Sequence, residues 1–138
     1  MGDLVVDASA ALAWLFGEEQ ARAIEARIGD RALVAPSLWR LEVVNAVLIK
    51  ERRKDITPAQ GTRFLRILEA MAIDIVAEPT GRSLEQLALF ARPHQVTAYD
   101  AVYLELATEL GLPLWTYDRD LQQAAKRLGV ELFTASEA

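Results

Sequence analysis

Short apolar runs alternate along the chain with longer stretches in which apolar residues recur at helical spacing. Leu4–Val6 is an apolar run that ends at Asp7, and runs of this kind predict buried strands. Stretches with an apolar residue every three or four positions predict helices that bury one face. Strands are predicted at 4–6, 32–35, 73–77, 114–117 and 130–133. Helices are predicted at 9–16, 18–28, 37–53, 57–71, 82–91, 97–110 and 120–128.

The alternation of strands and helices predicts an α/β fold. Right-handed crossovers between such strands give a mostly parallel sheet of about five short strands, with helices on both faces, in three α/β/α layers. Start and stop signals agree: Thr57, Pro58 and Gln60 open a helix with a capping box, and Gly111 and Pro113 end another. No internal repeat, low-complexity segment or linker interrupts the pattern, so a single domain over 1–138 is expected.

The composition narrows the classes of protein. Apolar residues make up 52% of the chain, but no run is long enough to span a membrane. The chain has no cysteine and no basic stretch before its first apolar run, so a cytoplasmic protein without a secretory signal is expected. A single histidine, His94, excludes a histidine-rich zinc site. The net charge of −5 argues against a broad non-specific grip on nucleic acid but leaves room for a local, metal-mediated contact with phosphate.

Four carboxylates are predicted to meet at one edge of the sheet. Asp7 and Asp118 directly follow predicted strands, while Glu42 and Asp100 lie near the starts of helices that begin at the same edge. The carboxyl ends of parallel strands share one edge, which is where ligands bind in open α/β sheets. Each acid alone has another explanation, as a helix cap or, for Glu42, as a side chain at the border of an apolar stripe. The occurrence of all four at one edge favours a common site.

Two of these acids fall on apolar helix faces. Asp100 shares a row with Leu104 at helical spacing, in the first turn after the predicted cap Thr97. Glu42 shares a row with Leu38 and Ala46, which predicts that it points inward. A buried carboxylate is unfavourable unless it is paired, neutralised or bound to a cation.

Carboxylates brought together in this way repel each other. A pair about 4 Å apart costs roughly 1 kcal/mol in water and about 4 kcal/mol at intermediate dielectric. Retained protons or a divalent cation relieve the repulsion, and oxygen ligands favour Mg²⁺ or Mn²⁺. A metal ion lowers the pKa of bound water and offsets charge on a phosphoryl group, so the pattern predicts metal-assisted phosphodiester hydrolysis.

Four segments of the chain together resemble a known family. They are Leu4–Ser9, Glu42–Asn45, Thr97–Tyr103 and Thr116–Leu121. In order and spacing they resemble the PIN-domain family, and most closely the VapC toxins of bacterial and archaeal toxin–antitoxin pairs. The resemblance extends from Leu4 to about Phe133.

The resemblance implies an Mg²⁺- or Mn²⁺-dependent endoribonuclease that forms a homodimer and is inhibited by a cognate VapB-type antitoxin. The catalytic and metal-binding acids it implies are Asp7, Glu42, Asp100 and Asp118. The supporting residues expected around them are Ser9, Asn45, Thr97, Thr116 and Asp120.

Basic and apolar side chains suggest further contacts. Arg40, Arg92 and Arg119 are expected to position RNA near the acids, whereas the basic stretch 50–54 lies at the far end of its helix. Large apolar residues, among them Trp14 and Phe64, exceed one buried face of their helices, which predicts that they lie at protein interfaces.

Other functions remain open from the sequence. The metal chemistry does not itself select the sugar, so a PIN-like nuclease acting on other nucleic acid is an alternative. A non-catalytic binding module with a PIN fold is another. A phosphatase of the haloacid dehalogenase type is disfavoured because Ser9 stands where its second aspartate belongs, and a receiver domain because no lysine ends a late strand.

Overall fold

The structure is a computed structural model that describes residues 3–78 and 82–134. Its strands are β1 (Leu4–Val6), β2 (Leu33–Pro36), β3 (Asp74–Val76) and β4 (Leu114–Trp115). Its α-helices are α1 (Ala8–Leu15), α2 (Glu19–Ile28), α3 (Leu38–Arg52), α4 (Pro58–Ala70), α5 (Leu84–Ala91), α6 (Ala98–Leu110) and α7 (Arg119–Leu128), with a 3₁₀ turn, η1 (Arg92–His94), after α5. No helix in the described residues is long and apolar enough to cross a membrane.

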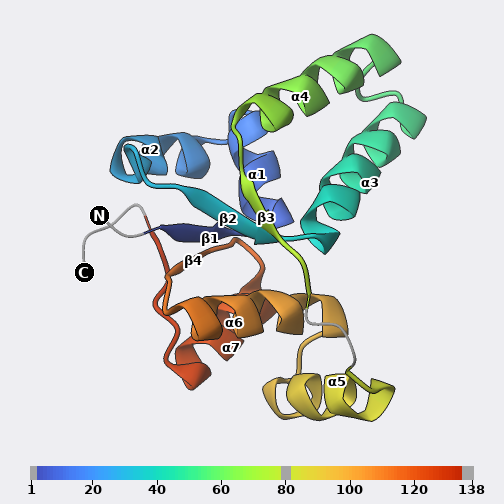
Figure 1. The fold of residues 1–138 in the computed structure, drawn as a ribbon. Helices are drawn as coiled ribbons and strands as arrows, with labels where there is room; N and C mark the ends of the chain where they lie inside the picture. The colour runs from blue at the N-terminus through green and yellow to red at the C-terminus, as the bar shows by residue number, and fades with distance from the viewer. Residues whose placement is uncertain (1–2, 79–81, 135–138) are drawn as a thin grey trace.

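The strands form a parallel sheet in the order β3-β2-β1-β4. Helices α1 to α4 lie on one side of the sheet and α6 and α7 on the other, while α5 packs beyond α6 (Figure 1). The predicted three-layer α/β/α fold is therefore confirmed. The central strand β1 is fully buried between the helical layers, which explains why Leu4–Val6 has no polar position.

The sheet has four strands in the described residues rather than about five. The predicted strand 130–133 is reduced to a single parallel bridge between Leu114 and Leu132. Its partner β4 ends at Trp115, because the next residue is engaged outside the sheet: the carbonyl oxygen of Thr116 accepts from Gln122 and its hydroxyl accepts from the Asp118 amide. A strand this short supports little pairing at its outer edge.

The buried face of α3 differs from the predicted one by one residue. Trp39, Val43 and Val47 form its buried row, whereas Glu42 lies beside that row and is half-buried. The cause is that α3 carries apolar residues on several faces, so their spacing alone does not select one. The predicted row of Leu38, Glu42 and Ala46 is therefore not the buried one, and the alternative, that Glu42 lies at the border of the apolar stripe, is the arrangement found.

The residues predicted to lie at interfaces pack in part against the core of the chain. Trp14, Phe16 and Phe64 are half-buried against the core, and the rings of Phe16 and Phe64 meet edge to face at 5.2 Å between centroids. This contact joins α1 to α4. Large exposed apolar side chains lie elsewhere, with Leu41 on α3 76% exposed and Leu84 on α5 85% exposed.

Candidate active site

The four predicted acids come together at the carboxyl edge of the sheet. Asp7 follows β1, Asp118 follows β4, Glu42 lies on the helix after β2, and Asp100 lies in the first turn of α6. Three of the acids experience the charge of others: Asp7 that of Glu42, Glu42 that of Asp118, and Asp100 that of the other three. Strand β1 has β2 on one side and β4 on the other, so the strand order reverses direction at β1. Open α/β sheets bind ligands at such a switch point, at the carboxyl edge.

Asp7 is the most buried of the four and is held by both of its oxygens. Its Oδ1 accepts hydrogen bonds from the Ser9 hydroxyl at 2.7 Å and from the Ala10 amide at 2.9 Å, and its Oδ2 accepts one from the Thr116 hydroxyl. Burial raises the pKa of Asp7 to about 6, with a smaller contribution from the charge of Glu42, while these hydrogen bonds oppose the rise. The bond from the Ala10 amide also caps α1, so Asp7 has a structural role as a helix cap in addition to its role in the acid cluster.

Ser9 and Thr116 connect the ends of β1 and β4 around Asp7. The Ser9 hydroxyl accepts from the Tyr117 amide at 3.0 Å, and the Thr116 hydroxyl accepts from the Asp118 amide at 3.0 Å. These bonds fix the loop that carries Asp118. The structure therefore places two of the predicted supporting residues directly beside an acid.

Asp118 and Asp100 form the other half of the cluster. Asp118 caps α7, its Oδ1 accepting from the Leu121 amide at 3.1 Å. Thr97 caps α6 through the Asp100 amide at 3.1 Å, but the structure gives α6 no reciprocal bond from the Asp100 side chain, unlike the capping boxes of α4 and α5. The Asp100 carboxylate is thereby directed to the cluster rather than to its own cap.

The surroundings of Asp100 disfavour its charge. Burial, followed by the charges of Asp118, Asp7 and Glu42, raises the pKa of Asp100 to about 7, and a hydrogen bond with Asp118 favours the protonated form further. Asp100 therefore holds its proton to a higher pH than an ordinary aspartate does. This is the electrostatic state expected of a site that binds a cation.

Glu42 reaches the cluster from the opposite helical layer and meets Tyr103. The Tyr103 hydroxyl donates a hydrogen bond to Glu42 Oε1 at 2.5 Å. Burial and the charge of Asp118 raise the pKa of Glu42, which the bond from Tyr103 opposes. Burial and the acids raise the pKa of Tyr103 far above its usual value, so its hydroxyl remains a donor. Sequence reasoning missed Tyr103 as a site residue, although it lies one turn after Asp100.

Other predicted residues lie outside the hydrogen-bonded cluster. Asn45 is exposed on α3, and Asp120 is exposed in the first turn of α7 and does not contribute to the charge interactions among the four acids. Thr97 is close in sequence to Asp100, but its side chain acts as a helix cap.

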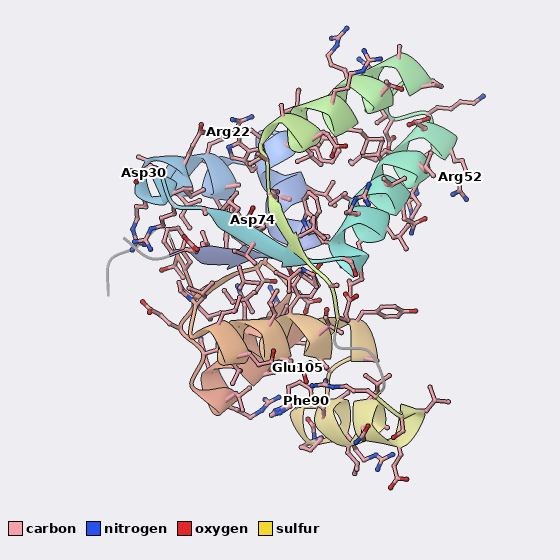
Figure 2. All side chains as sticks on the ribbon, in the orientation of Figure 1. Arg22, Asp30, Arg52, Asp74, Phe90 and Glu105 are labelled. Carbon is pink, nitrogen blue, oxygen red and sulfur yellow. The ribbon has the colours of Figure 1, made fainter. Side chains whose placement is uncertain are left out.

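The three predicted arginines are all exposed. Arg119 begins α7 beside Asp118, Arg92 begins the 3₁₀ turn, and Arg40 lies on α3. None of them has an ion-pair partner in the described part of the chain. In contrast, Arg52 in the basic stretch 50–54 lies at the end of α3 that is remote from the sheet (Figure 2), as the sequence predicted.

A second residue that the sequence analysis did not identify holds the start of α3. Glu78, at the end of the segment after β3, accepts hydrogen bonds from the Ser37 hydroxyl and, at 3.3 Å, from the Leu38 amide. Ser37 itself provides no side-chain cap. Glu78 therefore caps α3 from a distant part of the chain, and no local signal in the sequence could have revealed this contact.

A large cavity lies apart from the acid cluster. It measures about 820 Å³, lies between α3 and α4 and contains none of the four acids. Most of its lining is apolar, including Leu38, Trp39 and Leu65. The lining also includes Arg40 and Arg66, but none of the four acids that could hold a metal ion, so the chemistry is assigned to the sheet edge.

The acid cluster fits a divalent cation by its donor chemistry. No three acidic or histidine side chains in residues 3–78 and 82–134 are arranged as a preformed ligand set. Mg²⁺ commonly takes only one or two carboxylates directly and keeps several waters, so it does not require such a set. The raised pKa values of Asp7 and Asp100 indicate negative charge that a cation would stabilise.

Comparison with known proteins places this site in a family. The PIN domain model matches residues 4–127, and the chain therefore belongs to the PIN-domain family. It is 31% identical over 121 residues to Ribonuclease VapC3 of Pyrobaculum aerophilum, covering 87% of this chain and 92% of that protein. It is 31% identical over 127 residues to Ribonuclease VapC9 of Mycobacterium tuberculosis, covering 89% and 91% of the two chains. The crystal structure of PAE2754 from Pyrobaculum aerophilum superposes with a TM-score of 0.69 at 27% identity, covering 88% of this chain and 78% of that one.

Proposed function

We propose that the protein is a Mg²⁺- or Mn²⁺-dependent endoribonuclease, the toxin of a toxin–antitoxin pair. The convergence of four carboxylates at the sheet edge, where burial and the neighbouring charges raise the pKa values of Asp7, Glu42 and Asp100, is the observation that carries this proposal. The similarity to relatives named as VapC ribonucleases supports RNA as the substrate.

The four acids would hold the ion, and the other residues of the site would keep them in place. When bound, the ion supplies a water of lowered pKa and offsets charge on the phosphodiester. Ser9 and Thr116 orient Asp7 and the loop that carries Asp118. Because carboxylate ligands must be deprotonated, Asp100 would lose its proton when it serves as a ligand.

The test is cleavage of labelled single-stranded RNA, with single-stranded DNA of the same sequence in parallel. We expect RNA cleavage with Mg²⁺ or Mn²⁺ and none in EDTA. Asp100→Asn, purified in the same way, should be inactive and excludes contaminating ribonuclease. Asp55→Asn, which changes an exposed acid beyond the far end of α3, is the matched control and should retain activity.

Each contrary outcome has a distinct meaning. Full activity in EDTA would rule out the metal mechanism. Preferential cleavage of DNA would identify a nuclease for other nucleic acid, and RNA binding without cleavage would identify a binding module.

The exposed arginines Arg40, Arg92 and Arg119 are proposed to position RNA rather than take part in the chemistry. Each neutralised phosphate contact contributes to the salt dependence of binding. We expect Arg119→Ala to weaken RNA binding and reduce the slope of log affinity against log salt, since this residue adjoins Asp118. Arg52→Ala, at the remote end of α3, is the control. Equal slopes for Arg119→Ala and wild type would remove Arg119 from the RNA site.

We further propose that a cognate VapB-type antitoxin inhibits the protein and that the protein forms a homodimer. The relatives' names support the pairing. Co-expression with the product of the adjacent gene tests it: a stable complex that no longer cleaves RNA is expected, and an unbound, fully active protein would contradict it.

A further inference from the structure

Tyr103 has a buried hydroxyl within the acid cluster that the predicted set of site residues does not include. It lies on α6, one helical turn after Asp100, and its side chain is 1% exposed. A hydroxyl buried to this degree needs a hydrogen-bond partner. It donates to Glu42 Oε1 at 2.5 Å.

This hydrogen bond joins two layers of the molecule. Glu42 belongs to α3, which packs against α1 and α4 on one side of the sheet, whereas Tyr103 belongs to α6 on the other side (Figure 1). Among the described residues, the hydrogen bond from Tyr103 is the one that the Glu42 carboxylate accepts. The contact therefore fixes Glu42 from across the sheet edge.

The anchoring of Glu42 differs from that of Asp7 and Asp118. Those two acids are short, and backbone amides of α1 and α7 hold them. A glutamate has more rotatable bonds and loses more conformational freedom when it is fixed. Tyrosine is a rigid donor. By donating to one carboxylate oxygen of the glutamate, it can hold the longer side chain while the second carboxylate oxygen stays available.

We propose that Tyr103 is a positioning residue of the acid cluster, which orients the Glu42 carboxylate for the divalent cation. The inference rests on the proposed metal-dependent function. Partners that orient metal ligands are generally worth a tenfold to hundredfold change in affinity or activity. The ring of Tyr103 also fills the core, so only the hydroxyl distinguishes positioning from packing.

Tyr103→Phe removes the hydroxyl and keeps the ring. Tyr99→Phe is the matched control, because it removes a hydroxyl from an exposed position on the same helix. We expect both variants to unfold cooperatively in EDTA. By titration calorimetry, Tyr103→Phe should bind Mn²⁺ about tenfold to hundredfold more weakly than wild type. Its kcat for RNA should fall more than its KM changes, and Tyr99→Phe should match wild type in each measurement.

A double-mutant cycle separates positioning from a packing defect. If the hydroxyl acts through Glu42, then Tyr103→Phe should have no further effect on Mn²⁺ affinity in a Glu42→Gln background. Equal losses in both backgrounds would overturn the proposal. So would a Tyr103→Phe protein with wild-type Mn²⁺ affinity and kcat.

Glu42→Asp provides an approach that leaves the core unchanged if Tyr103→Phe does not fold. It retains the charge but withdraws the carboxylate from the hydroxyl by one methylene, so it should lose Mn²⁺ affinity in the same range; wild-type affinity would overturn the proposal. A wild-type protein that neither binds Mn²⁺ nor cleaves RNA would overturn the proposed function together with this inference. A wild type that does both, beside a Tyr103→Phe variant that equals it, would overturn this inference alone.

Discussion

At the scale of single residues, two of the four acids serve the fold and the site together. Asp7 and Asp118 cap α1 and α7, so the helix-cap explanation of their positions is correct as well. Each cap uses Oδ1. Capping therefore leaves the second oxygen of Asp118 for the cluster, whereas the second oxygen of Asp7 is held by Thr116. Asp100, which caps nothing, is the acid on which the mutual repulsion has the clearest effect.

Replacing Asp100 should separate stability from activity. Asp100→Asn is nearly isosteric and removes one charge from a repelling group. In EDTA at pH 8 we expect a melting temperature equal to or above that of wild type, with RNA cleavage lost. Wild type should gain about 2.7 kcal/mol from Mn²⁺ at a hundredfold excess over its dissociation constant, and Asp100→Asn much less. Melting curves with and without Mn²⁺ measure this, and equal metal shifts would contradict the assignment of Asp100 to the metal site.

Asp7→Asn should behave differently from Asp100→Asn. Both oxygens of Asp7 accept hydrogen bonds, and an amide nitrogen in place of one oxygen would lose an acceptor. We expect Asp7→Asn to be inactive but to lack the stability gain of Asp100→Asn in EDTA. Melting temperatures of the two variants, measured side by side, test the contrast. An Asp7→Asn protein more stable than Asp100→Asn would show that repulsion outweighs these hydrogen bonds.

The same acids predict how stability depends on pH. Their pKa values are higher in the folded protein, about 6 for Asp7 and about 7 for Asp100, than the 3.8 of an unperturbed aspartate. At pH values between 3.8 and about 7, the folded state therefore binds more protons than the unfolded state. The free energy of unfolding falls as the pH rises through this window. Urea unfolding in EDTA should give a lower free energy at pH 7.5 than at pH 5. The slope should be shallower for Asp100→Asn, and a stability that rises over this range would contradict the folded-state pKa values.

At the scale of secondary-structure elements, α3 depends on a cap from a distant residue. Glu78 bonds to Ser37 and to the Leu38 amide at the start of the helix that carries Glu42. Burial opposes the charge of Glu78, but these hydrogen bonds outweigh it and lower the pKa of Glu78. The carboxylate is thus ionised under ordinary conditions, as a cap near a helix N-terminus requires.

Removing this cap should weaken the fold modestly. We expect Glu78→Ala to lower the free energy of unfolding by about 1 kcal/mol, the usual cost of losing an N-terminal cap. Glu69→Ala, an exposed change on α4, should stay within about 0.5 kcal/mol of wild type. Urea denaturation of the three proteins decides this. If Glu78→Ala and Glu69→Ala were equally stable, the cap would carry no net energy.

At the scale of the whole molecule, apolar side chains remain exposed on two separate elements. Leu41, Val44 and Leu48 lie on α3, and Leu84 and Leu89 lie on α5. Phe90 on α5 and Glu105 on α6 line the contact between these two helices (Figure 2). Helix α5 is therefore attached through one side, and its other side is exposed. Exposed apolar groups in this number usually mark interfaces.

We expect the proposed homodimer to use one of these two surfaces. Sedimentation velocity at micromolar concentration should show a dimer or larger species for wild type. Leu41→Glu and Leu84→Glu each place a charge on one surface, which is unfavourable if that surface is buried between copies. The variant whose charge falls in the dimer interface should be monomeric, and the other variant should remain a dimer and serve as its control. A monomeric wild type would rule out the dimer.

The sequence alone determined the layered α/β fold and the meeting of the four acids. Both follow from order along the chain: apolar runs separated by helices require parallel strands, and parallel strands bring their carboxyl ends to one edge. Asp7 and Asp118 follow strands directly, so no knowledge of packing was needed to place them. Caps such as Thr57 and Thr97 were equally predictable, because their partners lie three residues away.

Only the tertiary structure decided which atoms meet within that edge. Tyr103 and Glu42 are 61 residues apart, and Ser37 and Glu78 are 41 apart, so nothing local encodes either hydrogen bond. The buried face of α3 also depended on packing, because its apolar residues surround the helix and only contact with α1 and α4 selects Trp39, Val43 and Val47. The reduction of the last strand to one bridge has the same origin: hydrogen bonds from Gln122 and from the Asp118 amide engage Thr116, directly after Trp115, and end the edge on which that strand would have paired.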